Sequence, residues 1–169
     1  MPGSCDDLVV EFLKDSNNSM KFPYFATGCV VKGFGRGSKQ LGIPTANYPE
    51  DVVDKLPSAF DNGVYYGWAQ VDDGPVYKMV MSIGNNPYYN NEKKTMETYV
   101  INEFENDFYG SNLKTIMLGH LRPMTSFKNL DELITAIKKD IADAKELLEK
   151  PEENMYKSHQ FFNNPNVKL

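Results

Sequence analysis

One segment of the chain, residues 33–47, carries the residue types of a phosphate-binding site. Four of its first ten residues are glycines, which let backbone N–H groups approach an anion closely. Arg36 and Lys39 add positive charge to a chain of net charge -5. The glycine spacing fits neither a Walker A loop nor a dinucleotide-binding fingerprint. Taken alone, the glycines are equally compatible with an exposed surface loop.

The end of this segment, Pro44-Thr45-Ala46-Asn47, adds two oxygen-bearing side chains at a spacing of two. In an extended strand Thr45 and Asn47 project to the same side. A hydroxyl and an amide carbonyl are neutral oxygen ligands, which suit Mg²⁺ that keeps waters and substrate phosphates around it. The competing interpretation, that both residues only stabilise a turn, is the stronger one from these residues alone.

Glu97 is a second polar anomaly, because it lies in an otherwise good strand pattern, Thr95–Ile101, where carboxylates are disfavoured. Alternation puts Glu97, Tyr99 and Ile101 on one face. A solvated strand face is the ordinary explanation. Beside a metal and a substrate hydroxyl, Glu97 could instead accept the proton as that hydroxyl attacks phosphorus.

Short β patterns surround these residues. Strands are expected at Phe25–Val31, Val64–Val71, Val76–Ile83, Thr95–Ile101 and Leu113–Leu121. Between the second and third, Asp72-Asp73-Gly74-Pro75 predicts a hairpin turn in which the glycine supplies a positive φ. The strands are too close in sequence for crossover helices. We therefore expect a mainly β protein, a closed barrel over about residues 24–122 rather than a sandwich.

An amphipathic helix is expected after the barrel, over about residues 130–149. Its apolar residues recur at steps of three or four: Leu130, Leu133, Ile134, Ile137, Ile141, Ala144 and Leu148. Asn129 followed by Glu132 is a capping-box pattern, and Pro151 marks the stop. The apolar stripe should pack on the barrel, and Phe161 and Phe162 should either dock on the body or fray.

The bulk properties limit the classes of protein. With 169 residues, of which 41% are hydrophobic and 12% aromatic, the chain suits one folded domain, residues 23–169. Residues 1–22 read as an appendage in which Asp6–Lys14 can form a short helix. Its acidic residues do not resemble a targeting signal, and no apolar run could span a bilayer, so a cytoplasmic location is expected. Cys5 and Cys29 are too few for a disulfide framework.

The ordered motifs resemble the riboflavin kinase family, in its monofunctional eukaryotic form, over about Tyr24–Phe162. They are the glycine-rich loop, Pro44-Thr45-Ala46-Asn47, Ser82-Ile83-Gly84-Asn85-Asn86-Pro87, Met96-Glu97-Thr98, Asp107-Phe108-Tyr109-Gly110 and Leu121-Arg122-Pro123. The resemblance implies a six-stranded antiparallel closed β-barrel with a C-terminal helix. It also implies transfer of the γ-phosphate of ATP to the 5′-hydroxyl of riboflavin, giving FMN and ADP. The FMN adenylyltransferase of bacterial relatives is not expected, because the chain has no His-x-Gly-His motif.

The resemblance further implies roles for individual residues. Glu97 would be the catalytic base, and Thr45 and Asn47 would bind Mg²⁺, with Mn²⁺ or Zn²⁺ as alternative ions. The residues expected at ATP are Gly33, Lys39, Thr45, Val100, Asn102 and Tyr109. Those expected at riboflavin or FMN are Arg122, Thr125 and Phe127. The chain departs from its relatives at Tyr99, where histidine is frequent, and at Thr125, where some have lysine.

Two other functions remain open at this point. One is a barrel that binds a flavin or nucleotide without catalysis, and a weaker one is an RNA-binding barrel, which the acidic balance disfavours. Glu97 favours the kinase, because a pure binder needs no carboxylate beside ATP phosphates. The expected partners are therefore the small molecules riboflavin and ATP, without nucleic acid or membrane, acting on a monomer.

Overall fold

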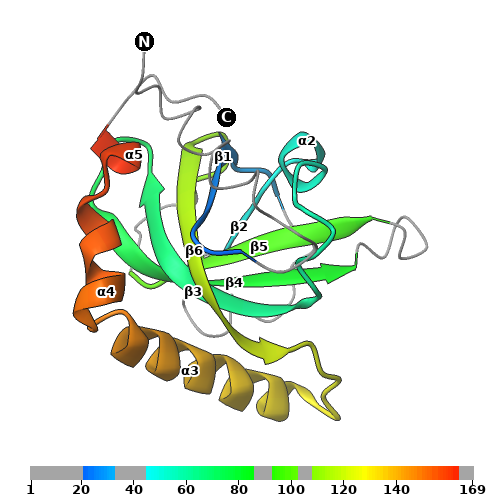
Figure 1. Cartoon of the computed structure of the whole chain (residues 1–169). Coiled ribbons are helices and arrows are strands. Elements are labelled where there is room, and N and C mark those ends of the chain that lie inside the picture. Colours follow the sequence, from blue (N-terminus) through cyan, green and yellow to red (C-terminus); the bar gives the residue numbers. More distant parts are fainter. Residues whose placement is uncertain (1–20, 33–44, 86–92, 103–107, 164–169) are drawn as a thin grey trace.

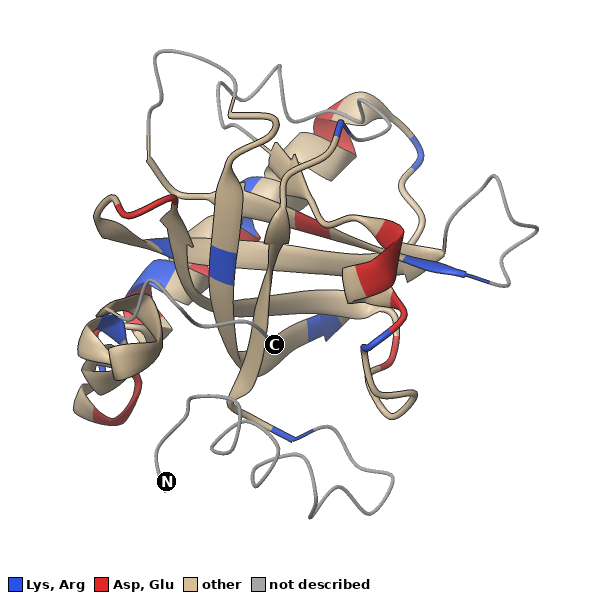
Figure 2. Ribbon diagram, turned by 90° about the horizontal axis from the view of Figure 1, so that it is seen from above, with Lys and Arg blue, Asp and Glu red and all other residues tan. Residues whose placement is uncertain are grey.

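The computed structural model describes residues 21–32, 45–85, 93–102 and 108–163 of the chain. The N-terminal appendage, with its expected helix Asp6–Lys14, lies outside the described residues, as does the glycine-rich loop as far as Pro44. In the described part, no helix is long and apolar enough to cross a membrane. Residues of both charge signs are interspersed along the ribbon of this part of the molecule (Figure 2).

Six antiparallel strands form one strongly curled sheet, a half-barrel (Figure 1). They are β1 (Tyr24–Cys29), β2 (Thr45–Asn47), β3 (Gly63–Val71), β4 (Val76–Asn85), β5 (Lys94–Val100) and β6 (Asn112–Pro123). Their order in the sheet is β1-β6-β3-β4-β5-β2, and a single bridge from Val31 to Asn47 joins the chain after β1 to the opposite edge strand. The mainly β prediction is confirmed, and all five predicted strands are present with ends within two residues of the expected ones.

The sheet is apolar on both faces because the strands alternate between two cores. Side chains such as Tyr65, Met81 and Val100 fill the concave interior, whereas Trp68 and Tyr99 belong to a second cluster on the outer face. The outer cluster is covered by C-terminal helices, which is why eight of the nine residues of β3 are buried. The concave face therefore encloses a packed interior, and the C-terminal helices cover part of the outer face.

Helix α3 (Leu130–Leu147) lies along the outer face, in contact with β3, β4 and β6 (Figure 1). Its start is capped as predicted, since the Asn129 side chain accepts a hydrogen bond of 2.9 Å from the Glu132 N–H. The apolar stripe is buried at Ile137, Ala144 and Leu148 and half-buried at Ile141, but Leu130 at its start is 44% exposed. The expected packing of the helix is thus confirmed for its C-terminal part, and the first turn projects beyond the sheet.

Pro151 does not end α3 directly. The helix stops at Leu147, and Pro151 opens a separate short helix, α4 (Pro151–Asn154), where its fixed φ suits the first turn. A 3₁₀ turn, η3 (Met155–Ser158), and α5 (Gln160–Asn163) follow. Phe161 and Phe162 on α5 are buried in the outer cluster, so they dock on the body. A further short helix, α2 (Glu50–Val53), follows β2 and packs against β1 and β5.

The predicted hairpin joins β3 to β4, but its positive φ belongs to a different residue. Asp72 has a φ of 52°, whereas Gly74 does not have a positive φ. Aspartate tolerates this left-handed conformation better than most residues. The Asp72 carboxylate also accepts a 2.9 Å hydrogen bond from the Asn112 N–H, which ties the turn to β6.

Candidate active site

The pairing of β2 with β5 brings together the residues that the sequence singled out for phosphate chemistry. Asn47 lies directly opposite Glu97, and Thr45 directly opposite Tyr99. Opposed residues of an antiparallel pair project to the same face, with Cβ atoms about 5 Å apart. The intervening residues Ala46 and Thr98 point the other way. The hydroxyl, the amide and the carboxylate therefore share the outer face.

A line of residues continues from Asn47 across the outer face of four more strands. Register pairs connect Asn47 on β2, Glu97 on β5, Ser82 on β4, Val64 on β3 and Arg122 on β6. We call these five residues the outer row. Neighbouring strands lie about 4.8 Å apart, so three strand spacings, about 14 Å measured along the curled sheet, separate the backbones at Glu97 and Arg122. The row thus has a carboxylate and an amide at one end and a guanidinium at the other.

Arg122 lies on the outer face, on the side that alternation from Ile116 and Leu118 also gives it. The β3–β6 register shifts twice on the way, between Val64 and Tyr65 and between Tyr66 and Gly67. Each shift leaves one residue of β6 unpaired and reverses the alternation, so the two together restore it. The family resemblance implied Arg122 as a flavin contact, whereas the two irregularities of β6 were not predicted.

The Arg122 guanidinium is held in a fixed position. Its Nε and Nη2 atoms donate to the two carboxylate oxygens of Asp140 on α3, each over 2.9 Å. Its Cζ atom lies 5.6 Å from the centre of the Phe127 ring. Of the three residues predicted at the flavin, the structure therefore brings Arg122 and Phe127 together, while Thr125 is exposed on the segment between β6 and α3.

Tyr99 occupies the outer face beside Glu97 and under α3. Its phenol is buried, which raises its pKa, and the negative charges of Glu97 and Asp140 raise it further against the opposing effect of Arg122. The hydroxyl is therefore neutral over the physiological pH range. Tyr99 can fill space and hydrogen-bond, but it cannot replace a histidine as a base, which agrees with the assignment of that role to Glu97.

The structure places the residues expected around the nucleotide in different parts of the molecule. Val100 lies in the concave interior with no exposed surface, so its side chain is on the opposite face from Glu97. Asn102 and Tyr109 lie in exposed segments after β5 and before β6. Gly33 and Lys39 lie outside the described residues. The structure therefore groups the metal and base candidates but not the whole predicted nucleotide site.

The donor set at β2 and β5 fits Mg²⁺ better than a metal held by the protein alone. In the part of the chain that is described, no group of three His, Cys, Asp or Glu residues could enclose a metal. Asn47 is only 6% exposed, which orders its amide beside Glu97. Mg²⁺ characteristically takes few protein oxygens together with substrate phosphates. Neutral oxygens from Thr45 and Asn47 fit this pattern.

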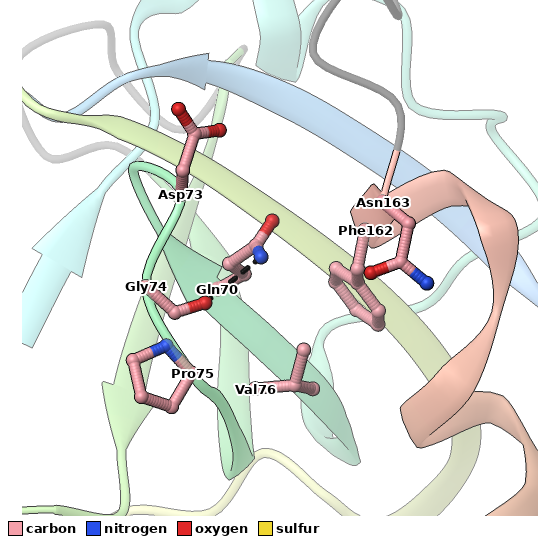
Figure 3. Close-up of a pocket in the computed structure, with 7 residues that line it drawn as sticks. All are labelled: Gln70, Asp73, Gly74, Pro75, Val76, Phe162 and Asn163. Atoms are coloured by element: carbon pink, nitrogen blue, oxygen red, sulfur yellow. Dashed lines mark hydrogen bonds between the residues drawn. The ribbon is translucent and has the colours of Figure 1, made fainter.

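A separate hollow lies at the other end of β3, between the β3–β4 hairpin and α5 (Figure 3). It is lined by Gln70, Asp73, Gly74, Pro75, Val76, Phe162 and Asn163 and encloses about 490 Å³. The Gln70 side chain donates to the Gly74 carbonyl over 2.9 Å, and its Oε1 atom has no hydrogen-bond donor among the described residues. We call it the Gln70 hollow; it contains none of the predicted site residues.

Comparisons with known proteins show the family to which the chain belongs. The model of the flavokinase class of enzymes, described as riboflavin kinase, matches residues 20–148. The chain belongs to the riboflavin kinase family, and it is an enzyme. It is 57% identical to human riboflavin kinase over 140 residues, which cover 83% of this chain and 90% of the human one.

Two further relatives extend the comparison. An Arabidopsis thaliana bifunctional riboflavin kinase/FMN phosphatase is 45% identical over 82% of this chain, which spans 37% of that protein. The crystal structure of riboflavin kinase from Trypanosoma brucei superposes with a TM-score of 0.69 at 35% identity, covering 87% of this chain and 90% of that one. The predicted fold class and family are thereby confirmed.

Proposed function

We propose that the chain transfers the γ-phosphate of ATP to the 5′-hydroxyl of riboflavin, with Glu97 as the base. The observation that carries this proposal is the direct pairing of Asn47 with Glu97 on the outer face. It supports the proposal because the Glu97 carboxylate, which could accept the hydroxyl proton, lies next to oxygens that could hold Mg²⁺. Family membership supports riboflavin and ATP as the substrates and FMN and ADP as the products.

Each group at the site has a part that follows from its chemistry. Mg²⁺, or Mn²⁺ or Zn²⁺ in its place, would be held by Thr45 and Asn47 and would neutralise phosphate charge when bound. Glu97 orients the ribityl hydroxyl and takes its proton as the oxygen bonds to phosphorus and the bond to the leaving ADP breaks. Phosphoryl transfer needs little more than such in-line positioning and charge neutralisation.

The outer row also suits the length of the acceptor. The separation of about 14 Å along the sheet between Glu97 and Arg122 would match a flavin whose ring lies near Arg122 and Phe127 and whose ribityl chain extends toward Glu97. Contacts of ATP with Gly33, Lys39, Val100, Asn102 and Tyr109, and of flavin with Thr125, remain predictions. So do the monomeric state, the cytoplasmic location and the domain limits at residues 1–22 and 23–169.

The test is the formation of FMN by the purified chain from riboflavin, ATP and MgCl₂, separated by chromatography. We expect Glu97→Gln to lower turnover by about 10²–10⁴-fold, the usual contribution of general base catalysis, while riboflavin still binds. Glu152→Gln on α4 is the matched control, because this exposed carboxylate lies outside the outer row. FMN absent from reactions of folded wild-type protein would refute the activity, and normal turnover of Glu97→Gln would refute only the base.

A further inference from the structure

Asp140 is the most unusual residue of α3. It lies between Ile137 and Ala144 on the buried side of the helix, and it is only 4% exposed. An ionised carboxylate is costly in such a place unless it is paired and hydrogen-bonded. The apolar stripe predicted for α3 passes through this position, so the carboxylate interrupts a packing surface. Its burial there is explained by its pairing with Arg122 and not by helix packing.

The partner of Asp140 is Arg122, and the geometry is that of a two-point clamp. Both carboxylate oxygens accept hydrogen bonds of 2.9 Å, from Nε and from Nη2. Two parallel hydrogen bonds fix the plane of the guanidinium. A lysine in place of Arg122 has no planar group and could not be oriented in this way. The Pro123 carbonyl, 3.4 Å from Nη1, and the Phe127 ring further limit the orientation.

This arrangement determines what Arg122 can offer a ligand. A guanidinium has five N–H donors; Asp140 takes two and Pro123 one. One N–H then remains on each terminal nitrogen, with its direction set by Asp140. Because the Asp140 charge also compensates that of Arg122, these donors suit a neutral acceptor, such as a carbonyl oxygen of a heterocycle, more than an anionic phosphate.

We propose that Asp140 is a positioning residue that holds Arg122 for the neutral ring of the acceptor and keeps phosphate groups from binding there. The inference rests on the proposed function in that it takes riboflavin as the acceptor. Asp140 does not contact the reacting atoms, which lie toward Glu97 at the other end of the outer row. Its loss should therefore weaken riboflavin binding far more than it affects phosphoryl transfer.

Asp140→Asn tests this directly, with Asp143→Asn as the matched control. Asp143 lies on the same helix, but its side chain is 43% exposed and pairs with Lys139 over 2.8 Å. For Asp140→Asn we expect the KM for riboflavin and its Kd from flavin fluorescence to rise about tenfold or more, as for a lost charge-assisted hydrogen bond. The KM for ATP and kcat should change less than about twofold.

A second measurement separates positioning from a merely structural role. Inorganic phosphate should compete with riboflavin in Asp140→Asn, whose Arg122 charge is uncompensated, and not in the wild type or Asp143→Asn. Unchanged riboflavin binding, or equal losses in kcat and both KM values together with a lower melting temperature, would overturn the inference.

Arg122→Lys keeps the proposal testable if Asp140→Asn does not fold. It preserves the charge pair but not the planar clamp, so riboflavin binding should weaken without phosphate competition, and unchanged binding would count against the proposal. Should the wild type form no FMN, the proposed function fails, and fluorescence titration of the same variants still decides whether Asp140 positions Arg122 for a flavin.

Discussion

The outer row and the Gln70 hollow lie on the same outer face of the sheet, about 20 Å apart along β3. Both contain a polar side chain that is at least nine-tenths buried, Asn47 in one and Gln70 in the other. In the outer row the buried amide lies opposite a carboxylate on the neighbouring strand. In the hollow the glutamine bonds to the carbonyl of its own hairpin.

The difference shows that burial of a polar group does not by itself define a reactive site. The pairing of β2 with β5, which are distant in sequence, brings together three groups of different chemistry: a hydroxyl, an amide and a carboxylate. In the hollow, Gln70 bonds to the Gly74 carbonyl of its own hairpin, and only its Oε1 atom remains as an acceptor. Substitutions in the two regions should therefore differ in kind, and the following predictions test that contrast.

The largest effect is expected from removing both neutral oxygens at β2. The double variant Thr45→Val and Asn47→Leu nearly keeps side-chain volume but removes both side-chain oxygens of β2. We expect catalytic efficiency to fall by about 100-fold or more, with the Mg²⁺ concentration for half-maximal rate raised at least tenfold. Thr45→Ser, which retains the hydroxyl, should behave like the wild type. An unchanged Mg²⁺ dependence of the double variant would remove these residues from the metal site.

A smaller effect is expected at Tyr99. Because burial and the nearby negative charges raise the pKa of this phenol above its ordinary value of 10.0, the group stays protonated in the folded protein. Its contribution to stability is present below pH 10 and is lost only at higher pH. Tyr99→Phe should change kcat by no more than about fivefold and leave the pH–rate profile between pH 6 and 9 unaltered. A basic limb that disappears in this variant would show that Tyr99 titrates.

The sequence and the structure agree best where a pattern is local. β-branched and aromatic runs predicted β3 to β6, and steps of three and four residues predicted α3, because these periodicities are properties of single elements. The sequence indicated Glu97 as a candidate base and Asn47 as a candidate metal ligand, each by itself. Their pairing was not predictable, because it depends on the register of strands 50 residues apart.

The ion pair between Asp140 and Arg122 and the turn conformation at Asp72 were not predicted from the sequence. Asp140 lies three residues after Ile137 and four before Ala144, so its place on the buried stripe could have been read from the spacing. Its pairing with Arg122 could not, because that pair depends on how α3 packs across β6. The turn at Asp72 shows the same limit, since glycine was the better candidate for a positive φ and aspartate adopts it.

The stability of the segment at α5, which borders the Gln70 hollow, should depend on pH and not on substrates. His159, just before α5, accepts a 3.0 Å hydrogen bond at Nδ1 from the Phe161 N–H, and its partial burial lowers its pKa below 6.5. The unfolded chain therefore binds more protons in this range, so stability present above pH 6.5 is lost as the pH falls through the lowered value. We expect a lower melting temperature at pH 5.5 than at pH 7.5, and a weaker pH dependence for His159→Asn. Identical pH dependence of the two proteins would contradict this.

The smallest effect is expected from Gln70→Leu. The substitution removes one hydrogen bond and also an acceptor that lacks a protein donor, so the free energy of unfolding should change by no more than about 1 kcal/mol. Both KM values and kcat should stay within about twofold of the wild type. A large kinetic loss in folded Gln70→Leu would break the contrast between the hollow and the outer row.

The central claim is that the outer row transfers phosphate to a flavin hydroxyl, and the fate of labelled phosphate tests it most directly. With γ-labelled ATP, riboflavin and Mg²⁺, the wild-type chain should place the label in FMN, and Glu97→Gln should form labelled FMN at least about 100-fold more slowly. Label that appears only as inorganic phosphate, or in FMN equally fast with both proteins, would contradict the account.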